Sequence, residues 1–120
     1  MKILIVDDSK AMRMIVMRHL RQAGFGSHTL EEASNGVEAL AAVTGAAPDL
    51  ILCDWNMPEM NGLDFLKALR GRSMQVPFGF VTTESSPEMR QTAHSEGAAF
   101  LIAKPFTVET FETTLAPFLK

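Results

Sequence analysis

Acidic, hydroxyl and basic side chains stand at the ends of four short apolar runs in this 120-residue chain. The first run ends in two aspartates, the second in one, the third in two threonines and the fourth in a lysine followed by proline. In chain order these residues are Asp7, Asp8, Asp54, Thr82, Thr83, Lys104 and Pro105. If the runs are parallel strands of one sheet, their carboxyl ends share an edge and these side chains converge there.

Three carboxylates at one edge predict a bound cation, because neighbouring carboxylates repel and raise one another's pKa unless a cation lies between them. The strand-end residues offer oxygen ligands and neither histidine nor cysteine, which favours a hard ion. Mg²⁺ fits best, since it takes one or two carboxylates, keeps waters and binds phosphate oxygens. A metal-bound aspartate opposite Lys104 would suit a phosphoryl group: the carboxylate attacks, metal and lysine neutralise the equatorial oxygens, and Thr82 donates a hydrogen bond.

The elements that would position these residues alternate along the chain, as apolar runs typical of strands buried on both faces and longer helical patterns. The expected strands are Lys2–Val6, Thr29–Ala33, Leu50–Cys53, Pro77–Thr82 and Phe100–Ala103. The expected helices are Ser9–Ala23, Gly36–Thr44, Gly62–Arg70, Ser86–Ser95 and Val108–Leu119, the first ended by Gly24. This alternation predicts a doubly wound α/β fold, a five-stranded parallel sheet with five helices over both faces.

Length and composition narrow the class of protein. The length fits one domain, and 47% hydrophobic with 21% charged residues excludes a disordered chain. A net charge of −3 argues against free binding to nucleic acid. The single cysteine favours a reducing compartment, and no apolar run reaches the roughly 18 residues of a membrane span. We therefore expect a cytoplasmic domain without membrane insertion.

The same residues resemble the signature of a known family. Asp7-Asp8, the stretch from Asp54 to Pro58, Thr82 and the stretch from Lys104 to Phe106 are similar to the receiver domain of two-component response regulators, in order and spacing. The stretch Asp-Trp-Asn-Met-Pro and Glu84 look especially like the single-domain chemotaxis regulators. The resemblance covers essentially the whole chain. It implies a flavodoxin-like sheet of order 2-1-3-4-5 and one receiver domain over residues 1–120 with no output domain.

The resemblance also implies a role for each matching residue. Asp54 would accept a phosphoryl group from a histidine kinase or a histidine phosphotransfer protein. Asp8 and Asp54 would bind Mg²⁺ directly, Asp7 largely through water, and Asn56 through its backbone carbonyl. Lys104 would bind the phosphoryl group.

A switch is implied by the resemblance as well, with Thr82 moving towards the phosphoryl group and the Lys104–Pro105 peptide in the cis form. Three positions depart from the family pattern. Asn61 replaces the aspartate that is common before Gly62, which should matter little because asparagine caps a helix equally well. Thr83 stands where an alanine is usual. Leu101 stands where an aromatic side chain normally rotates with the threonine, while the adjacent Phe100 should face the other side of the strand. The usual aromatic switch is therefore in question, but the phosphorylation chemistry is not.

Two further placements follow from side-chain patterns. Met14 and Met17 fall near the side of the first helix opposite the core stripe of Val16 and Leu20. They are either scattered exposed apolar residues or a docking patch for a partner helix, and both interpretations stay open. Trp55 is expected on the loop near the metal rather than in the core.

The leading hypothesis is a stand-alone signalling switch, a monomer whose output is phosphorylation-dependent contact with an unknown protein, with chemotaxis as a candidate pathway. It would be no enzyme beyond catalysing its own phosphorylation and dephosphorylation. An intermediate phosphoryl carrier in a multistep relay is the alternative. An aspartyl-phosphate hydrolase is disfavoured because its Asp-x-Asp pair is missing at the strand ends. A flavin binder is disfavoured because Asp7-Asp8 would repel the cofactor's phosphate.

Overall fold

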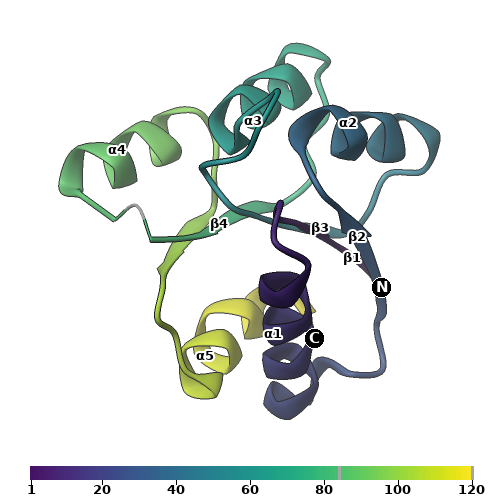
Figure 1. Cartoon of the computed structure of the whole chain (residues 1–120), viewed down its shortest axis with the longest axis vertical. Coiled ribbons are helices and arrows are strands. Elements are labelled where there is room, and N and C mark those ends of the chain that lie inside the picture. Colours follow the sequence, from purple (N-terminus) through teal and green to yellow (C-terminus); the bar gives the residue numbers. More distant parts are fainter. Residues whose placement is uncertain (84, 120) are drawn as a thin grey trace.

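A parallel β-sheet forms the centre of the molecule, seen in a computed structural model that describes residues 1–83 and 85–119. Glu84, which contributed to the resemblance, lies outside the described residues. The strands are β1 (Lys2–Val6), β2 (Thr29–Ala33), β3 (Leu50–Cys53), β4 (Phe78–Thr82) and β5 (Phe100–Ala103). Within the described part of the chain they form one five-stranded sheet of order β2-β1-β3-β4-β5, with every adjacent pair parallel (Figure 1). The strand order implied by the resemblance is confirmed.

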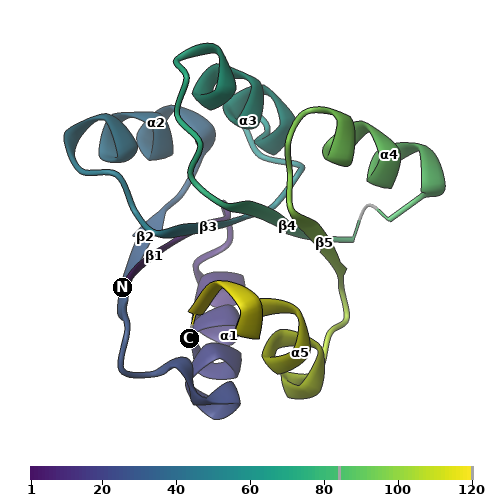
Figure 2. The same cartoon turned by 180° about the vertical axis from the view of Figure 1, so that it is seen from behind.

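Helices cover both faces of the sheet, which confirms the doubly wound architecture. They are α1 (Lys10–Leu20), α2 (Gly36–Gly45), α3 (Gly62–Gly71), α4 (Pro87–Ser95) and α5 (Val108–Leu119). Figures 1 and 2 show α1 and α5 together on one face and α2, α3 and α4 on the other. None of the helices in residues 1–83 and 85–119 is long and apolar enough to cross a membrane.

Alternate residues of the central strands feed two separate cores. In β1, Leu4 belongs to the core under α2, α3 and α4, while Ile3 and Ile5 belong to the core under α1 and α5. All three side chains are at most 2% exposed. A strand whose two faces are both covered has no need of polar residues, which is why its sequence reads as a continuous apolar run.

The first helix ends differently from its prediction as a regular helix to Ala23. α1 stops at Leu20, and a π-helical turn, η1 (Arg21–Phe25), continues the chain. Gly24 has φ of 96°, a left-handed conformation that glycine adopts without steric cost. The wider turn brings Phe25 into the core, where it is 8% exposed. The regular helix thus ends three residues before the predicted Ala23, and Gly24 lies inside the π-helical turn that follows it.

One glycine is required by a close backbone approach beside the site. Gly62 begins α3, and its N–H donates to the Trp55 carbonyl at 2.8 Å, which closes the loop after β3. A Cβ at this position would lie 2.1 Å from the Asp54 carbonyl oxygen and 3.0 Å from a ring carbon of Phe80. Because the nearest atom belongs to the backbone, it cannot turn aside.

We expect Gly62→Ala to lower the free energy of unfolding by about 1–3 kcal/mol, the usual cost of overpacking. Gly71→Ala is the matched control at the other end of α3, since its Cβ would meet nothing within 4 Å. That variant should be unchanged or gain up to about 1 kcal/mol. Urea unfolding of both variants measures the difference, and equal stability of the two would contradict the close approach at Gly62.

Candidate functional site

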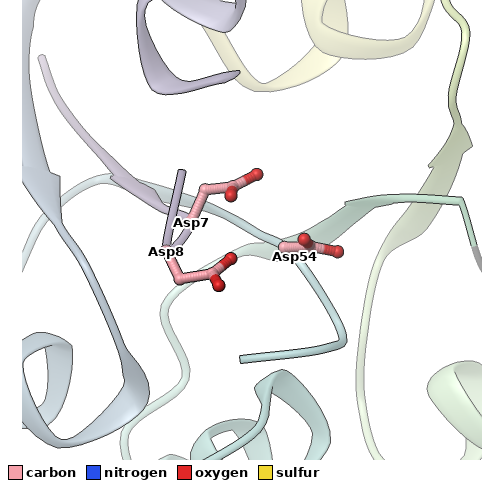
Figure 3. Close-up of side chains that lie close together, drawn as sticks. All are labelled: Asp7, Asp8 and Asp54. Atoms are coloured by element: carbon pink, nitrogen blue, oxygen red, sulfur yellow. The ribbon is translucent and has the colours of Figure 1, made fainter. Parts of the chain in front are cut away.

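Three carboxylates gather at the carboxyl edge of the sheet. Asp7 and Asp8 directly follow β1, and Asp54 directly follows the neighbouring strand β3, where Val6 is paired with Cys53. One carboxylate oxygen from each aspartate lies within 4.8 Å of the other two, and Figure 3 shows the three side chains at this edge. Asp7 is buried and Asp8 is exposed. Hard oxygen ligands this close together suit Mg²⁺, with the exposed side of the cluster open to water.

Lys104 places its ammonium group between two of these carboxylates. Nζ lies 3.1 Å from Asp7 Oδ2 and 3.4 Å from Asp54 Oδ2. The backbone of Lys104 is fixed as well, because its N–H donates to the Thr82 carbonyl at 2.8 Å. The side chain is only 11% exposed, so the ammonium is held at the carboxylates rather than in bulk water. The Lys104–Pro105 peptide bond is cis, in agreement with the expectation.

In Asp7 and Asp54, the carboxylate oxygen that does not face Lys104 accepts a hydrogen bond from a backbone N–H. The Ser9 N–H donates to Asp7 Oδ1 at 2.9 Å, and the Trp55 N–H donates to Asp54 Oδ1 at 2.7 Å. Each carboxylate is therefore held at both oxygens, by an N–H on one side and by Lys104 on the other. The orientation of both groups is fixed by the chain itself.

The surroundings of Asp7 raise the pKa of its carboxyl above the ordinary value of 3.8. Burial is the main cause, and the negative charge of Asp54 acts in the same direction. The Ser9 N–H and the ammonium of Lys104 oppose them, but do not reverse the direction. A cation at this cluster would favour the ionised form.

The remaining predicted site residues lie around this cluster at different depths. Thr82 is the last residue of β4 and is buried, whereas Thr83 is exposed. Asn56 is exposed in the loop after Asp54. Leu101 lies on β5, partly buried against the core that also contains Phe80. The structure therefore brings Asp7, Asp8, Asp54 and Lys104 into direct proximity, with Thr82 joined to Lys104 through the backbone.

The expectation for Trp55 is wrong. Its side chain is only 8% exposed and packs against Phe80, with ring centroids 4.7 Å apart. The physical reason is the tight closure of the loop by Gly62, because the chain turns back over α3 and the large apolar indole gains more from the core than from an acidic edge.

The placement of Met17 is also wrong, while that of Met14 is confirmed. Met14 is 54% exposed, but Met17 is partly buried against the core that contains Val16 and Leu20. The apolar side of α1 is wider than a single stripe because the helix contacts both the sheet and α5. Only Met14 is left as an exposed methionine of the pair, and its role in docking stays a prediction.

Sequence reasoning missed Arg13, which contacts the backbone of the site. Its Nη1 donates to the Asp7 carbonyl at 2.6 Å. An arginine in the first turn of a helix that follows an acidic pair was the available signal, since it can reach back to the strand end.

The raised pKa of Asp7 predicts a pH-dependent cost to folding in metal-free protein. A carboxyl with a higher pKa in the folded state favours folding while it is protonated, and this contribution is lost as the pH rises through the folded-state pKa. The amide of Asp7→Asn resembles the protonated carboxyl. In EDTA at pH 7, the free energy of unfolding of this variant should therefore be higher than that of the unaltered chain. This difference in stability should shrink as the pH falls towards 3.8.

Asp8→Asn is the control, because Asp8 belongs to the same cluster but is exposed. Its effect on stability at pH 7 should be smaller than that of Asp7→Asn. Chemical denaturation at several pH values measures both. A loss of stability in Asp7→Asn at pH 7 in EDTA would show that the Lys104 and Ser9 contacts outweigh burial.

Comparison with known proteins agrees with the fold. The family model described as the response regulator receiver domain matches residues 3–116. The chain is 39% identical over 118 residues to the chemotaxis protein CheY1 of Helicobacter pylori, covering 96% of this chain and 94% of that protein. It is 39% identical over 117 residues to the chemotaxis protein CheY-3 of Vibrio cholerae, covering 96% and 88%.

A solved structure is similar over the same length. The chemotaxis response regulator CheY4 of Vibrio cholerae is 42% identical, with a TM-score of 0.85 and 98% of each chain covered. The family match spans nearly the whole of the sheet and its helices, and these relatives are covered almost from end to end. The chain therefore belongs to the family of response regulator receiver domains and is similar to its chemotaxis members.

Proposed function

We propose that Asp54 accepts a phosphoryl group in a Mg²⁺-dependent reaction and that the chain acts as a stand-alone response regulator in the cytoplasm. The observation that carries this proposal is the contact of one ammonium, that of Lys104, with both Asp7 and Asp54 at an edge where three carboxylates lie within 4.8 Å. Such an arrangement suits a group that brings further negative oxygens. The chain matches 94% and 98% of the length of two chemotaxis relatives, which supports the receiver role.

The phosphodonor we propose is the phosphohistidine of a kinase or phosphotransfer protein. A carboxylate oxygen of Asp54 attacks phosphorus, the P–N bond breaks, and the imidazole nitrogen leaves with the bonding electron pair and takes up a proton. The Trp55 N–H holds the attacking carboxylate in one orientation, at 2.7 Å from Oδ1. Lys104, which is 3.4 Å from Asp54 Oδ2, is placed to neutralise a phosphoryl oxygen.

Mg²⁺ would be held directly by the carboxylates of Asp8 and Asp54 and largely through water by Asp7, with the backbone carbonyl of Asn56 as a further oxygen ligand. When bound, it neutralises charge on the carboxylates and on the transferred group. The raised pKa of Asp7 fits this proposal, because a site that disfavours its own negative charge gains from a second cation beside Lys104.

The output we propose is contact with another protein, in a chemotaxis pathway. The names of the relatives with 39% and 42% identity support the pathway. The exposed surface of α4, next to the partly buried Leu101 of β5, is where we propose that the contact forms. We propose that Thr82 connects the site to this surface, because it is buried at the end of β4 and its carbonyl accepts a hydrogen bond from the Lys104 N–H. Leu101 has no flat ring to rotate, and it already packs against the core.

Incubation with acetyl phosphate and Mg²⁺ should add one phosphoryl group to the chain, measured by intact mass. Asp54→Asn should add none, because the nucleophile is gone, and Asp8→Asn should add much less. Asp64→Asn is the matched control, since it removes an exposed aspartate on α3 and should leave labelling unchanged. Labelling that survives Asp54→Asn or EDTA would refute the proposal.

The state dependence of the output should depend on Thr82 rather than on Leu101. Leu101→Ala should weaken binding of the output protein by a similar factor in both states, because a fixed apolar contact is lost. Thr82→Ala should mainly erase the difference between the states. The output protein is first captured with the phosphorylated chain. Its affinity for each variant, with and without phosphorylation, then measures both effects. If Leu101→Ala removes the phosphorylation dependence and spares basal binding, then leucine serves as the switch.

A further inference from the structure

The guanidinium of Arg13 joins the first turn of α1 to the ends of two strands. Nη1 donates to the Asp7 carbonyl at 2.6 Å, and Nε donates to Glu32 Oε1 of β2 at 2.8 Å. The side chain is only 13% exposed. A planar guanidinium with two acceptors in different directions is held more rigidly than a single ion pair.

The Asp7 carbonyl belongs to the peptide group that joins Asp7 to Asp8, and the other polar groups of Asp7 are held by separate hydrogen bonds. The Asp7 N–H donates to the Ala33 carbonyl at 3.1 Å, which fixes the residue to β2. Its carboxylate is held by Ser9 and Lys104. Because the peptide group is planar, fixing the Asp7 carbonyl also fixes the direction in which the chain enters Asp8. Asp8 is exposed, so little packing would hold it otherwise.

We infer that Arg13 is a positioning residue for the cation site, which fixes the Asp7–Asp8 peptide so that both carboxylates stay beside Asp54. The inference rests on the proposed function, because the cation is the one that phosphorylation of Asp54 would require. Arg13 contacts the backbone carbonyl of Asp7 and the carboxylate of Glu32, not a carboxylate that would hold the cation. It acts through the backbone of Asp7.

Charge and position predict opposite effects for the loss of Arg13. A positive group next to carboxylates repels a second cation, so its removal by charge alone would strengthen Mg²⁺ binding. Glu32, in contact at 2.8 Å, already offsets part of that charge. If Arg13 acts by position, its removal weakens Mg²⁺ binding although the chain becomes more negative. The sign of the change therefore distinguishes the two roles.

The experiment is a calorimetric titration of the unphosphorylated full chain with Mg²⁺. Arg13→Met should weaken binding by about tenfold, the low end of what loss of a residue behind the metal ligands costs. Arg13→Lys should lose about threefold, because an ammonium keeps the charge but lacks the fork that spans two acceptors. Arg18→Met removes the same charge from an exposed position of α1 and should stay within about twofold of the unaltered chain.

Phosphorylation kinetics give a second readout that a merely structural role would not move. In Arg13→Met, the Mg²⁺ concentration for half-maximal labelling by acetyl phosphate should rise, while the rate at saturating Mg²⁺ should change little. Circular dichroism in EDTA checks that the variant is folded. If Arg13→Met does not fold, Arg13→Lys decides, with a loss of about threefold supporting the inference and unchanged affinity overturning it.

Binding of Mg²⁺ by folded Arg13→Met that is equal to or tighter than that of the unaltered chain would overturn the inference alone. The proposed function would stand in that case, provided that Asp54 is still labelled. Failure of the unaltered chain to bind Mg²⁺ or to label at Asp54 would instead overturn both.

Discussion

The contact of Lys104 with Asp7 and Asp54 is the interaction on which the rest of the site depends. Parallel strands in adjacent positions bring their terminal aspartates together whether or not the charges tolerate it. With the Asp7 side chain 6% exposed, water screens little of the repulsion. A lysine that enters from β5, two strands away from β3 in the order of the sheet, supplies the compensating charge. The order of the strands therefore brings the carboxylates together and also brings in the lysine that balances their charge.

Most of the fold was predictable because burial on both faces leaves a continuous apolar run. β3 reads Leu-Ile-Leu-Cys, and its bounds agree with the prediction for this reason. The order of the strands is a different matter, since hydrophobicity shows that a strand is covered but not which strand lies beside it. That order came from the resemblance alone. Within β2, the acidic pair Glu31 and Glu32 is compatible only with an edge strand, as the structure shows.

The site was predictable to the extent that it depends on backbone ends. Asp7, Asp54 and Lys104 follow strands, so parallel topology alone brings them to one edge. Trp55 was misplaced because its position depends on how tightly a loop closes, which the glycine at position 62 sets through a contact in space. Arg13 was missed because its partners lie at the end of one strand and on another, and helical spacing carries no information about either.

Charge at this edge also links the resting site to the state that we propose. The ammonium of Lys104 contacts Asp7 and Asp54. A phosphoryl group added to Asp54 would compete with Asp7 for the same N–H donors. Asp7 would then lose a contact that lowers the pKa of its carboxyl, while burial would still raise it. A second cation becomes more necessary after transfer than before it, because the cluster gains negative oxygens and no further protein cation. The hydrogen bonds of the Asp7 N–H with the Ala33 carbonyl, of the Asp7 carbonyl with Arg13 and of the Asp7 carboxylate with the Ser9 N–H would remain to hold the site in shape.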